Sequence, residues 1–453
     1  MFCDKKTTIA AIATPPGEGG VAIIRVSGDS AVEIVDTIFS GPITTYKTHT
    51  AHLGKILDKT GCPIDEVLVL VMHAPKSYTG ENTVEIHCHG GILITQKVLE
   101  RTLQAGAKAA SPGEFTFRAF INGKLDLAQA EAVQTVIGAR NERALASAKE
   151  HLQGSLSKKI TSWQKTLIDI TATLEACLDF PEEGLDFETE TELLSALQSV
   201  HQEIEKLLST FDEGKKIQDG LSLCLLGAPN VGKSSLMNAL LGIERAIVTN
   251  IAGTTRDVLE APLMLSGLHC QLLDTAGIHT TEDLIEEEGI KRAKVAMEKA
   301  DLILYVLDSS RHLNHEEYNL LETLPKTHTI LVWNKQDLPQ IHASHPLFPY
   351  QVHLSATTLQ GIDSLKKTIA HVIKTGMLPS KEEVIISSLR HKEALHNASF
   401  SIRDVTTGIK NNASPEILCA DMRHTLKSLG DIIGMDISEE ILTAIFSKFC
   451  LGK

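Results

Sequence analysis

The order of apolar and polar positions along the chain divides it into segments of different periodicity. In the first quarter, short runs rich in β-branched residues lie between turns that contain glycine and proline. Such runs predict strands, which we expect at residues 8–13, 21–26, 66–73 and 83–87. Residues 1–118 are therefore expected to form an α+β domain.

The next segment has the period of helices. One apolar stripe runs from Leu127 to Ile137, and another runs from Leu167 to Leu178 and ends before Pro181. Apolar residues at these intervals occupy one face of a helix, and proline ends a helix or lies beyond it. We expect residues 119–216 to be helical.

Strand and helix patterns alternate over residues 217–376. The apolar run Leu221–Leu226 predicts a strand, and residues 235–241 predict a helix with one apolar face. Alternation of this kind is typical of a mostly parallel sheet built from βαβ units. This segment is expected to be an α/β domain.

Helices return over residues 377–453. An apolar stripe runs from Leu389 to Val405, and Ser414-Pro415 predicts the start of a further helix, with an N-cap followed by proline at the first position. Helices that each have a single apolar face are expected to pack against one another. We therefore predict a multidomain protein in which the α/β domain is inserted into an all-α domain.

Residues 227–234 read Gly-Ala-Pro-Asn-Val-Gly-Lys-Ser, the pattern of a phosphate-binding loop. Its glycines allow backbone N–H groups to surround phosphates, Lys233 neutralises phosphate charge, and the Ser234 hydroxyl can bind Mg²⁺. The loop lies between a predicted strand and a predicted helix, as this motif requires.

Four further motifs follow in order and predict that the nucleotide is GTP. They are Gly253-Thr254-Thr255, the Asp-x-x-Gly motif Asp274-Thr275-Ala276-Gly277, Asn334-Lys335-Gln336-Asp337 and Ser355-Ala356. In Asn334-Lys335-Gln336-Asp337, the Asp337 carboxylate can accept hydrogen bonds from the N1 and exocyclic amino groups of guanine. Adenine would leave this carboxylate unpaired, at a cost on the order of 10⁴-fold in selectivity. The residues expected to contact GTP are Asn230, Val231, Gly232, Lys233, Ser234, Ser235, Thr249, Asn250, Ile251, Ala252, Gly253, Thr254, Thr255, Asp274, Thr275, Ala276, Gly277, Asn334, Lys335, Asp337, Ser355 and Ala356.

The residue that orients the attacking water is not obvious from the motifs. Ras-like GTPases carry a glutamine directly after Asp-x-x-Gly, but this chain has Ile278 there, and an aliphatic side chain cannot polarise water. The next polar residues are Glu282, Asp283, Glu286, Glu287 and Glu288. One of these carboxylates can orient water, although an acidic first turn also stabilises a helix through its dipole.

The cation that stabilises the transition state has two candidate sources. The Asn230 side chain and the backbone carbonyls of residues 249–254 can form an oxygen cage for a monovalent ion beside the phosphates. Arg256 is the alternative, as an arginine finger supplied by the chain itself.

Composition limits the remaining possibilities. The 453 residues suffice for about three domains. With 43 Lys and Arg against 57 Asp and Glu, the net charge of −14 argues against a surface that binds nucleic acid throughout. The N-terminus has no secretory signal pattern and no apolar run is long enough to cross a membrane, so we expect a cytoplasmic protein without a membrane partner. The eight scattered cysteines are expected to be free thiols.

Several stretches of the chain have a distinctive sequence. They are Thr14-Pro15-Pro16-Gly17, Ser77-Tyr78-Thr79-Gly80-Glu81, His89-Gly90-Gly91, Pro112-Gly113-Glu114-Phe115, residues 124–132, the loop 227–234, residues 249–257 and Cys450-Leu451-Gly452-Lys453. Together they resemble the MnmE/TrmE family of tRNA-modifying GTPases. The resemblance covers the whole chain and includes its last four residues, Cys-Leu-Gly-Lys.

The resemblance implies a fold, an activity and partners. The fold would comprise an N-terminal domain that binds folate and dimerises (1–118), a helical domain in two parts (119–216 and 377–453) and an inserted Ras-like P-loop G domain (217–376). The activity would be potassium-activated GTP hydrolysis, with the two G domains of a homodimer driven together. With an MnmG/GidA-type FAD protein, in a heterotetramer or larger complex, it would add a carboxymethylaminomethyl or aminomethyl group at C5 of the wobble uridine of certain tRNAs.

The resemblance also implies ligands for particular residues. Potassium would lie among Asn230, Thr249, Ile251 and Thr254, and Mg²⁺ would be held by Ser234 and Thr255. Glu286 would orient water, and Cys450 would be a reactive thiol. A tetrahydrofolate derivative, either 5-formyl- or 5,10-methylene-tetrahydrofolate, would contact Arg25, Glu85, Lys124 and Lys453. The chain departs from the family pattern at Leu451, where isoleucine is usual, and at Glu18, where a basic residue is common.

Three alternatives stay open at this stage. A signalling GTPase anchored by lipid would use Cys450, although Gly452 and Lys453 fit a prenylation signal poorly. A ribosome-assembly GTPase would act as a binding switch. Separately, His87 and His89 alternate along a strand and face the same side, where they bind a metal, form a polar strand end, or belong to the wall of the folate site.

Overall fold

The computed structural model describes residues 7–179, 187–243, 260–265, 268–274, 297, 300–341, 344–373, 384–435, 437–450 and 452–453. The chain divides into two compact units. Unit 1 comprises Met1–Ile137, Lys149–Gln202 and Glu393–Lys453, and unit 2 comprises Gly138–Ala148 and Glu203–Lys392.

Unit 1 begins with a six-stranded sheet in the order β3-β4-β5-β2-β1-β6. Its strands are β1 (Ile9–Ile12), β2 (Gly19–Ser27), β3 (Thr50–Leu57), β4 (Pro63–Met72), β5 (Thr83–Gly90) and β6 (Lys108–Ala109). Neighbours are antiparallel except for β1 and β6. The four strands expected from the sequence are confirmed. Strand β3 escaped prediction because it is the edge strand, and its polar and glycine positions dilute the apolar pattern.

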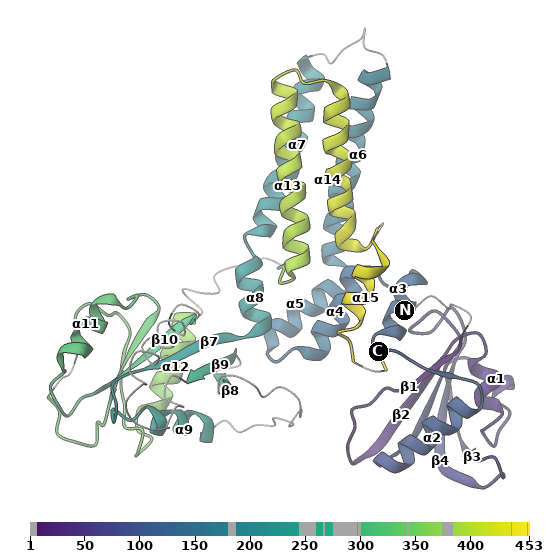
Figure 1. The fold of residues 1–453 in the computed structure, drawn as a ribbon, viewed down its shortest axis with the longest axis horizontal. Helices are drawn as coiled ribbons and strands as arrows, with labels where there is room; N and C mark the ends of the chain where they lie inside the picture. The colour runs from purple at the N-terminus through teal and green to yellow at the C-terminus, as the bar shows by residue number, and fades with distance from the viewer. Residues whose placement is uncertain are drawn as a thin grey trace. The chain divides into compact units, whose positions relative to one another are not determined.

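The two faces of this sheet differ in kind. Alternate residues such as Ile24, Val26 and Ile86 are buried in a core shared with α1 (Ala31–Asp36) and α2 (Ile92–Gln104), which cover one face (Figure 1). Because side chains alternate along a strand, Arg25 and Glu85 point to the opposite face. A short 3₁₀ helix (η1, Ile43–Thr45) precedes β3.

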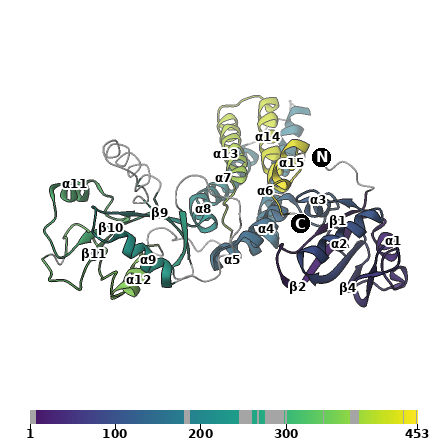
Figure 2. The ribbon, with the colours of Figure 1, turned by 60° about the horizontal axis from the view of Figure 1, so that its bottom comes forward.

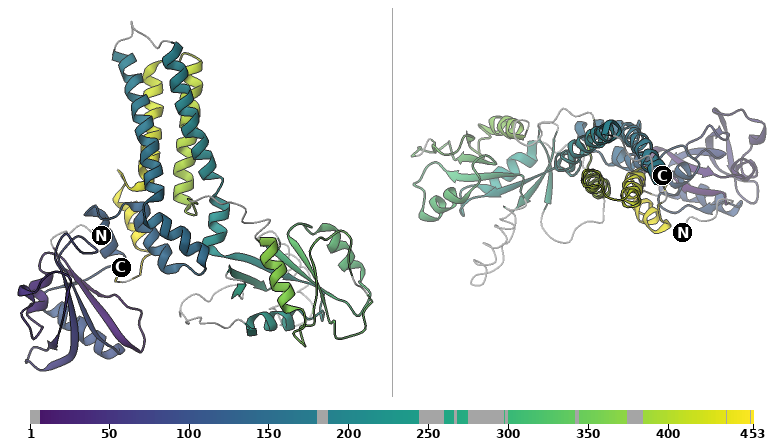
Figure 3. Two further views of the ribbon diagram at one scale, coloured as in Figure 1. Left: turned by 180° about the vertical axis from the view of Figure 1, so that it is seen from behind. Right: turned by 90° about the horizontal axis from the view of Figure 1, so that it is seen from above.

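The helical part of unit 1 is a bundle. Figure 3 shows α6 (Ser155–Asp179) and α7 (Phe187–Leu208) on one side and α13 (Leu389–Lys410) and α14 (Pro415–Ile433) on the other. Helices α6 and α14 contact each other along their lengths, and Arg423 donates to Glu175 at 2.9 Å. The prediction that the helical segments before and after the α/β domain pack against one another is confirmed. Ser414 is the N-cap of α14 and Pro415 follows it, but the Ser414 side chain makes no capping bond.

The last helix connects the bundle segment of unit 1 to its N-terminal sheet. Helix α15 (Glu439–Phe446) contacts α3 (Glu114–Ile121) (Figure 2). The Phe446 ring is fully buried against α3 and α4 (Leu127–Gly138). Beyond it the chain reaches strand β1, where Gly452 lies against the backbone of Ile12.

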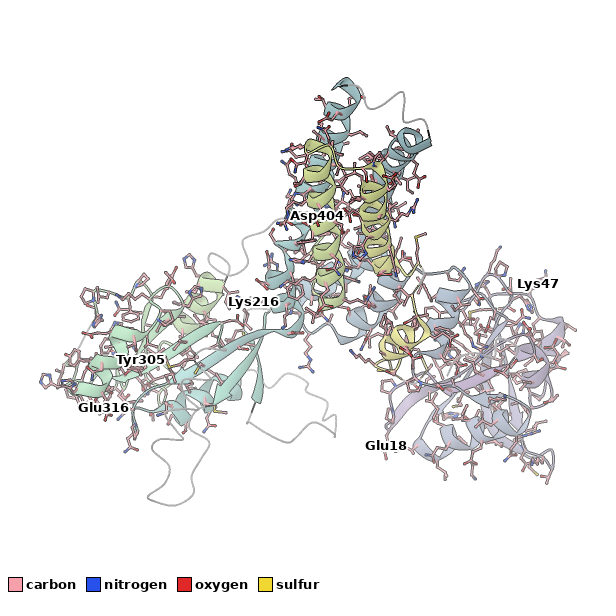
Figure 4. The ribbon with its side chains drawn as sticks, turned by 45° about the horizontal axis from the view of Figure 1, so that its top comes forward. Glu18, Lys47, Lys216, Tyr305, Glu316 and Asp404 are labelled. Carbon is pink, nitrogen blue, oxygen red and sulfur yellow. The ribbon has the colours of Figure 1, made fainter. Side chains whose placement is uncertain are left out.

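Unit 2 contains a second six-stranded sheet in the order β12-β11-β10-β7-β9-β8. Its strands are β7 (Leu221–Leu226), β8 (Glu260–Leu265), β9 (Leu268–Asp274), β10 (Leu302–Asp308), β11 (Thr329–Asn334) and β12 (Gln351–His353). Adjacent strands are parallel except for β8 and β9. Figure 4 places Tyr305 within this sheet, where its side chain is buried.

The helices of unit 2 complete the expected α/β pattern. They are α8 (Phe211–Asp219), α9 (Lys233–Ile243), α11 (His315–Thr323) and α12 (Ile362–Val372), while α5 (Glu142–Leu152) begins in this unit. Strand β7 has the predicted bounds, and α9 begins two residues earlier than expected because the phosphate-loop lysine is already helical. Among the helices described, none combines the length and apolarity that crossing a membrane requires.

Candidate functional site

The phosphate-binding loop connects β7 to α9 at the carboxyl end of the parallel sheet. The Lys233 ammonium donates to the carbonyl oxygens of Gly227 at 2.7 Å and Ala228 at 2.8 Å, so its charge is held over the loop. Ser234 and Ser235 are exposed in the first turn of α9. Backbone N–H groups at this end of a helix are unpaired and attract anions.

Two glycines of the loop have no room for a side chain. At Gly227, φ is +152° and a Cβ would collide with the carbonyl of Val306; at Gly232, φ is +97° and a Cβ would collide with the Asn334 amide. Both contacts bring the loop close to the ends of neighbouring strands. Asn230 also has a positive φ, +63°, and is exposed.

The side chain of Asn334, at the end of β11, joins the phosphate loop to the base-binding loops. Its Nδ2 donates to the Val231 carbonyl at 2.9 Å, and its Oδ1 accepts from the Ala356 N–H at 3.0 Å. Asn334 is 2% exposed. The buried side-chain amide of Asn334 therefore connects three predicted motifs. Val231 and Ala356, the residues it joins, are 125 residues apart in the sequence.

The remaining base-site residues lie beside it. Lys335 donates to Asp308 at 2.7 Å. Burial of Asp308 opposes its ionisation, but hydrogen bonds from Lys335 and Ser310 outweigh that effect and keep its pKa below the ordinary value. Asp337 is exposed and so available to a base.

Asp308 is a site residue that the sequence reasoning missed. The sequence feature that could have revealed it is an acidic residue directly after the apolar run of strand β10. Ser355, by contrast, was predicted, and it is fully buried with its N–H donated to the Gln360 carbonyl at 2.9 Å.

Several predicted nucleotide and catalytic residues lie outside the described part of the chain. They are Thr249, Asn250, Ile251, Ala252, Gly253, Thr254, Thr255, Thr275, Ala276, Gly277 and Glu286, together with the alternatives Ile278, Arg256, Glu282, Asp283, Glu287 and Glu288. Asp274 is the last residue of β9, where its backbone is in register with Leu225 of β7.

A second cluster lies on the open face of the N-terminal sheet. Arg25 of β2 is in register with Glu85 of β5, and its Nε donates to Glu85 Oε1 at 2.9 Å. Arg25 Nη1 also donates to the carbonyl of Gly452 at 3.2 Å. Three of the predicted folate residues, Arg25, Glu85 and Lys453, are thus brought together by the folding of the C-terminus onto β2.

Two aromatic rings complete this cluster. The guanidinium of Arg25 lies 5.5 Å from the ring centroid of Tyr78 and 5.7 Å from that of Phe115, and Lys453 Nζ lies 5.9 Å from Tyr78. Burial, and then the Arg25 charge, lower the pKa of Lys453, while burial raises the pKa of Tyr78. Neither aromatic residue was predicted as a ligand contact, although both lie in the motifs that carried the family resemblance.

The other predicted residues are placed differently. Lys124 is exposed and donates to the Pro75 carbonyl at 3.2 Å. Cys450 is exposed and has a free thiol, and its backbone carbonyl accepts a hydrogen bond from the Lys453 N–H. His89 binds Asp65 at 2.8 Å, and among the described residues there is no group of three side chains suited to hold a metal ion.

The parallel sheet, its phosphate loop after β7 and its base loop after β11 define a P-loop GTPase domain of the Ras-like type, inserted into a helical protein. The family profile described as "MnmE helical domain" matches residues 127–450, and that described as "GTP-binding protein TrmE N-terminus" matches residues 8–124. The chain belongs to the MnmE family of tRNA modification GTPases.

Individual relatives match over nearly the full length. The tRNA modification GTPase MnmE of Protochlamydia amoebophila is 57% identical over 446 residues, which cover 98% of this chain and 97% of the relative. That of Moorella thermoacetica is 44% identical over 460 residues, covering 98% and 99%. Among solved structures, a variant of Aquifex aeolicus Era bound to GDP·AlF₄⁻ is 27% identical with a TM-score of 0.28, over 40% of this chain and 66% of that chain.

The chain is therefore a GTP-binding enzyme that hydrolyses GTP and acts in tRNA modification. Family membership over nearly the whole chain decides against the alternatives of a lipid-anchored signalling GTPase and a ribosome-assembly switch.

Proposed function

We propose that this enzyme is activated by potassium and that, with an MnmG/GidA-type flavoprotein, it adds a carboxymethylaminomethyl or aminomethyl group to C5 of the wobble uridine of certain tRNAs. The observation that supports the tRNA-modifying part of the proposal is the placement of the C-terminal tail. Gly452 accepts a hydrogen bond from Arg25, and Lys453 lies over Tyr78. The tail that bears Cys450 therefore ends at the cluster that we assign to folate.

The cluster has a donor set suited to a tetrahydrofolate derivative. Arg25 and Glu85 are each 14% exposed, and Lys453 adds a second cation beside the single carboxylate. Cations bind carboxylate and carbonyl oxygens, and a carboxylate accepts from the N–H groups of a pterin. When bound, a 5-formyl- or 5,10-methylene-tetrahydrofolate would supply a one-carbon unit; Arg25, Glu85, Lys453 and, at the cluster's margin, Lys124 would hold it.

The metal sites adjoin the phosphate loop. The Ser234 hydroxyl, exposed in the first turn of α9, is a hard oxygen ligand of the kind that Mg²⁺ prefers, and Thr255 is assigned as its companion. Asn230 is exposed in the loop, and its side-chain oxygen would bind potassium with Thr249, Ile251 and Thr254.

Hydrolysis is proposed to occur in a homodimer. The N-terminal segment 1–118 would dimerise, the helical segments 119–216 and 377–453 would carry the G domain 217–376, and potassium would bring two G domains together. Glu286 would orient the attacking water, and Cys450 would act as a reactive thiol. We place this activity in the cytoplasm, with tRNA, in a heterotetramer or larger complex with the flavoprotein.

The potassium proposal is tested by steady-state GTP hydrolysis of the purified chain in matched KCl and NaCl buffers. We expect KCl to raise kcat about a hundredfold, the lower end of the effect of one transition-state contact, and Asn230→Ala to remove this difference. Asn238→Ala, an exposed position on the following helix, is the matched control and should keep the response. Equal rates in both salts for the unaltered chain would overturn the potassium site.

A further inference from the structure

His87 is a histidine of the N-terminal sheet that the proposed function leaves without a role. It follows Glu85 on β5 with one residue between them, so both side chains lie on the open face of the sheet. The His87 Nε2 atom is enclosed and has no hydrogen-bond partner. It lies 3.5 Å from Glu85 Oε2.

The two oxygens of Glu85 are therefore not equivalent. Oε1 accepts the Arg25 Nε–H at 2.9 Å. Oε2 faces His87 at a distance that is too long for a hydrogen bond to a neutral ring but short enough for an ion pair with a protonated one. Oε2 is thus the oxygen that remains for the N–H groups of a ligand.

The strands on either side of His87 present mainly apolar residues to it. Ile23 of β2 and Leu68 of β4 are its register partners. Among the described residues, the pair adjoins the charges of Arg25 of β2, which donates to Glu85, and of Lys453 of the tail, which interacts with Glu85. Further along β4, Asp65 is bound to His89, and Glu66 is in register with Lys55 of β3.

We propose that His87 is a positioning residue for Glu85 whose protonation regulates binding at the Arg25–Glu85 cluster. This inference rests on the proposed function and deepens it. A neutral imidazole leaves Glu85 Oε2 free to accept from the ring N–H groups of a tetrahydrofolate. An imidazolium attracts Oε2 into an ion pair and withdraws it from the ligand, because a charged donor competes strongly for a carboxylate.

The sign of the effect follows directly. Histidine is the side chain that can change charge between about pH 5 and 8, so raising the pH through this range favours the neutral ring over the competing cation. Ligand affinity should increase with pH. The expected change between pH 5.8 and 7.8 is about fivefold, the size of one partly exposed charge pair.

The binding test uses the full chain and 5-formyltetrahydrofolate, with affinity measured by calorimetry at both pH values. The unaltered chain should bind about fivefold more tightly at pH 7.8, and His87→Gln, which cannot become charged, should bind with equal affinity at both. His89→Gln is the matched control, because His89 lies on the same strand and face but is paired with Asp65; it should keep the fivefold ratio. Two results would overturn the proposal: equal affinities at the two pH values in the unaltered chain, or a His87→Gln variant that still binds about fivefold more tightly at pH 7.8.

A second measurement does not depend on folate. Imidazole resonances of selectively labelled histidine, assigned to His87 through the His87→Gln variant, give its titration midpoint by NMR. Glu85→Gln should move this midpoint to lower pH, because it removes the carboxylate that favours the imidazolium. If the chain bound no tetrahydrofolate but the midpoint moved, the folate assignment would fail and the His87–Glu85 coupling would stand; an unmoved midpoint would refute the coupling itself.

Discussion

The buried amide of Asn334 shows how much one residue determines in the nucleotide site. Its two hydrogen bonds connect the phosphate loop at Val231 with the base loop at Ala356. Because both partners are backbone groups, their own side chains reveal nothing of the contact. The sequence predicted Asn334 as a nucleotide residue through its motif, but the fold shows that it also holds two loops in place.

Replacing Asn334 by alanine should therefore weaken nucleotide binding through the shape of the site. The change leaves the Val231 carbonyl and the Ala356 N–H unpaired, at about 1–3 kcal/mol for each buried group. We expect at least about tenfold weaker binding of a fluorescent GTP analogue. The control is Gln336→Ala, whose amide contacts the exposed His353 ring, and which should bind within about twofold of the unaltered chain. Similar affinities for both variants would contradict the role of Asn334.

Lys453 supplies a prediction from its titration. Burial, and then the Arg25 charge, lower its pKa from the ordinary value of 10.5. The Lys453 ammonium of the docked tail thus binds its proton less tightly than that of a free tail. Its charge makes the free energy of docking less favourable at pH values below the lowered pKa. This cost disappears as the pH rises from the lowered pKa to 10.5. The test is competitive labelling with an amine-reactive reagent at a series of pH values, with the extent of labelling of each lysine measured by mass spectrometry and divided by its maximum at high pH. Labelling of Lys453 should reach half of its maximum at a lower pH than labelling of the exposed Lys427. Coincident midpoints would show that the tail is not docked in this way.

At the scale of elements, the predictable parts were those with strong local patterns. Strand β7 and the N-cap of α14 were predicted to the residue. The signal for β7 is an apolar run that ends at the phosphate loop, and the signal for α14 is a Ser-Pro pair, so in both cases the signal lies within the element or next to it in sequence. The edge strand β3 was missed because its order depends on pairing with β4. Patterns within a segment predict that segment, whereas pairing between segments depends on the fold.

The C-terminal tail is an element whose position rests on one glycine. Gly452 has φ +86°, and a Cβ there would collide with the carbonyl of Ile12. Gly452→Ala should displace the tail from β1 and so return the labelling midpoint of Lys453 towards the value of an exposed lysine. Gly61→Ala is the matched control, with φ +84° but open space around it; it carries the same backbone strain and should leave Lys453 unchanged. An unaltered Lys453 midpoint in Gly452→Ala would contradict the docking.

At the scale of the whole molecule, the two clusters differ in how far sequence could reveal them. The nucleotide site is built from motifs that each carry their own chemistry, so its residues could be named before the fold was known. The N-terminal cluster joins Arg25 to Gly452 across 427 residues, and its members are ordinary charged residues when taken singly. Only the family resemblance assigned them, while Tyr78 and Phe115 became visible through their contacts.

The central claim is that GTP recognised through Asp337 drives the modification of tRNA. Asp337→Asn replaces a carboxylate that accepts from guanine by an amide that can donate to the additional carbonyl of xanthine, so it should exchange GTP for XTP as the usable nucleotide.

The decisive measurement is therefore mass spectrometry of nucleosides from tRNA treated with this chain, an MnmG/GidA-type flavoprotein and either nucleotide. The account predicts modified wobble uridine with GTP for the unaltered chain and with XTP, not GTP, for Asp337→Asn. Modification that proceeds equally with either nucleotide, or without one, would contradict it.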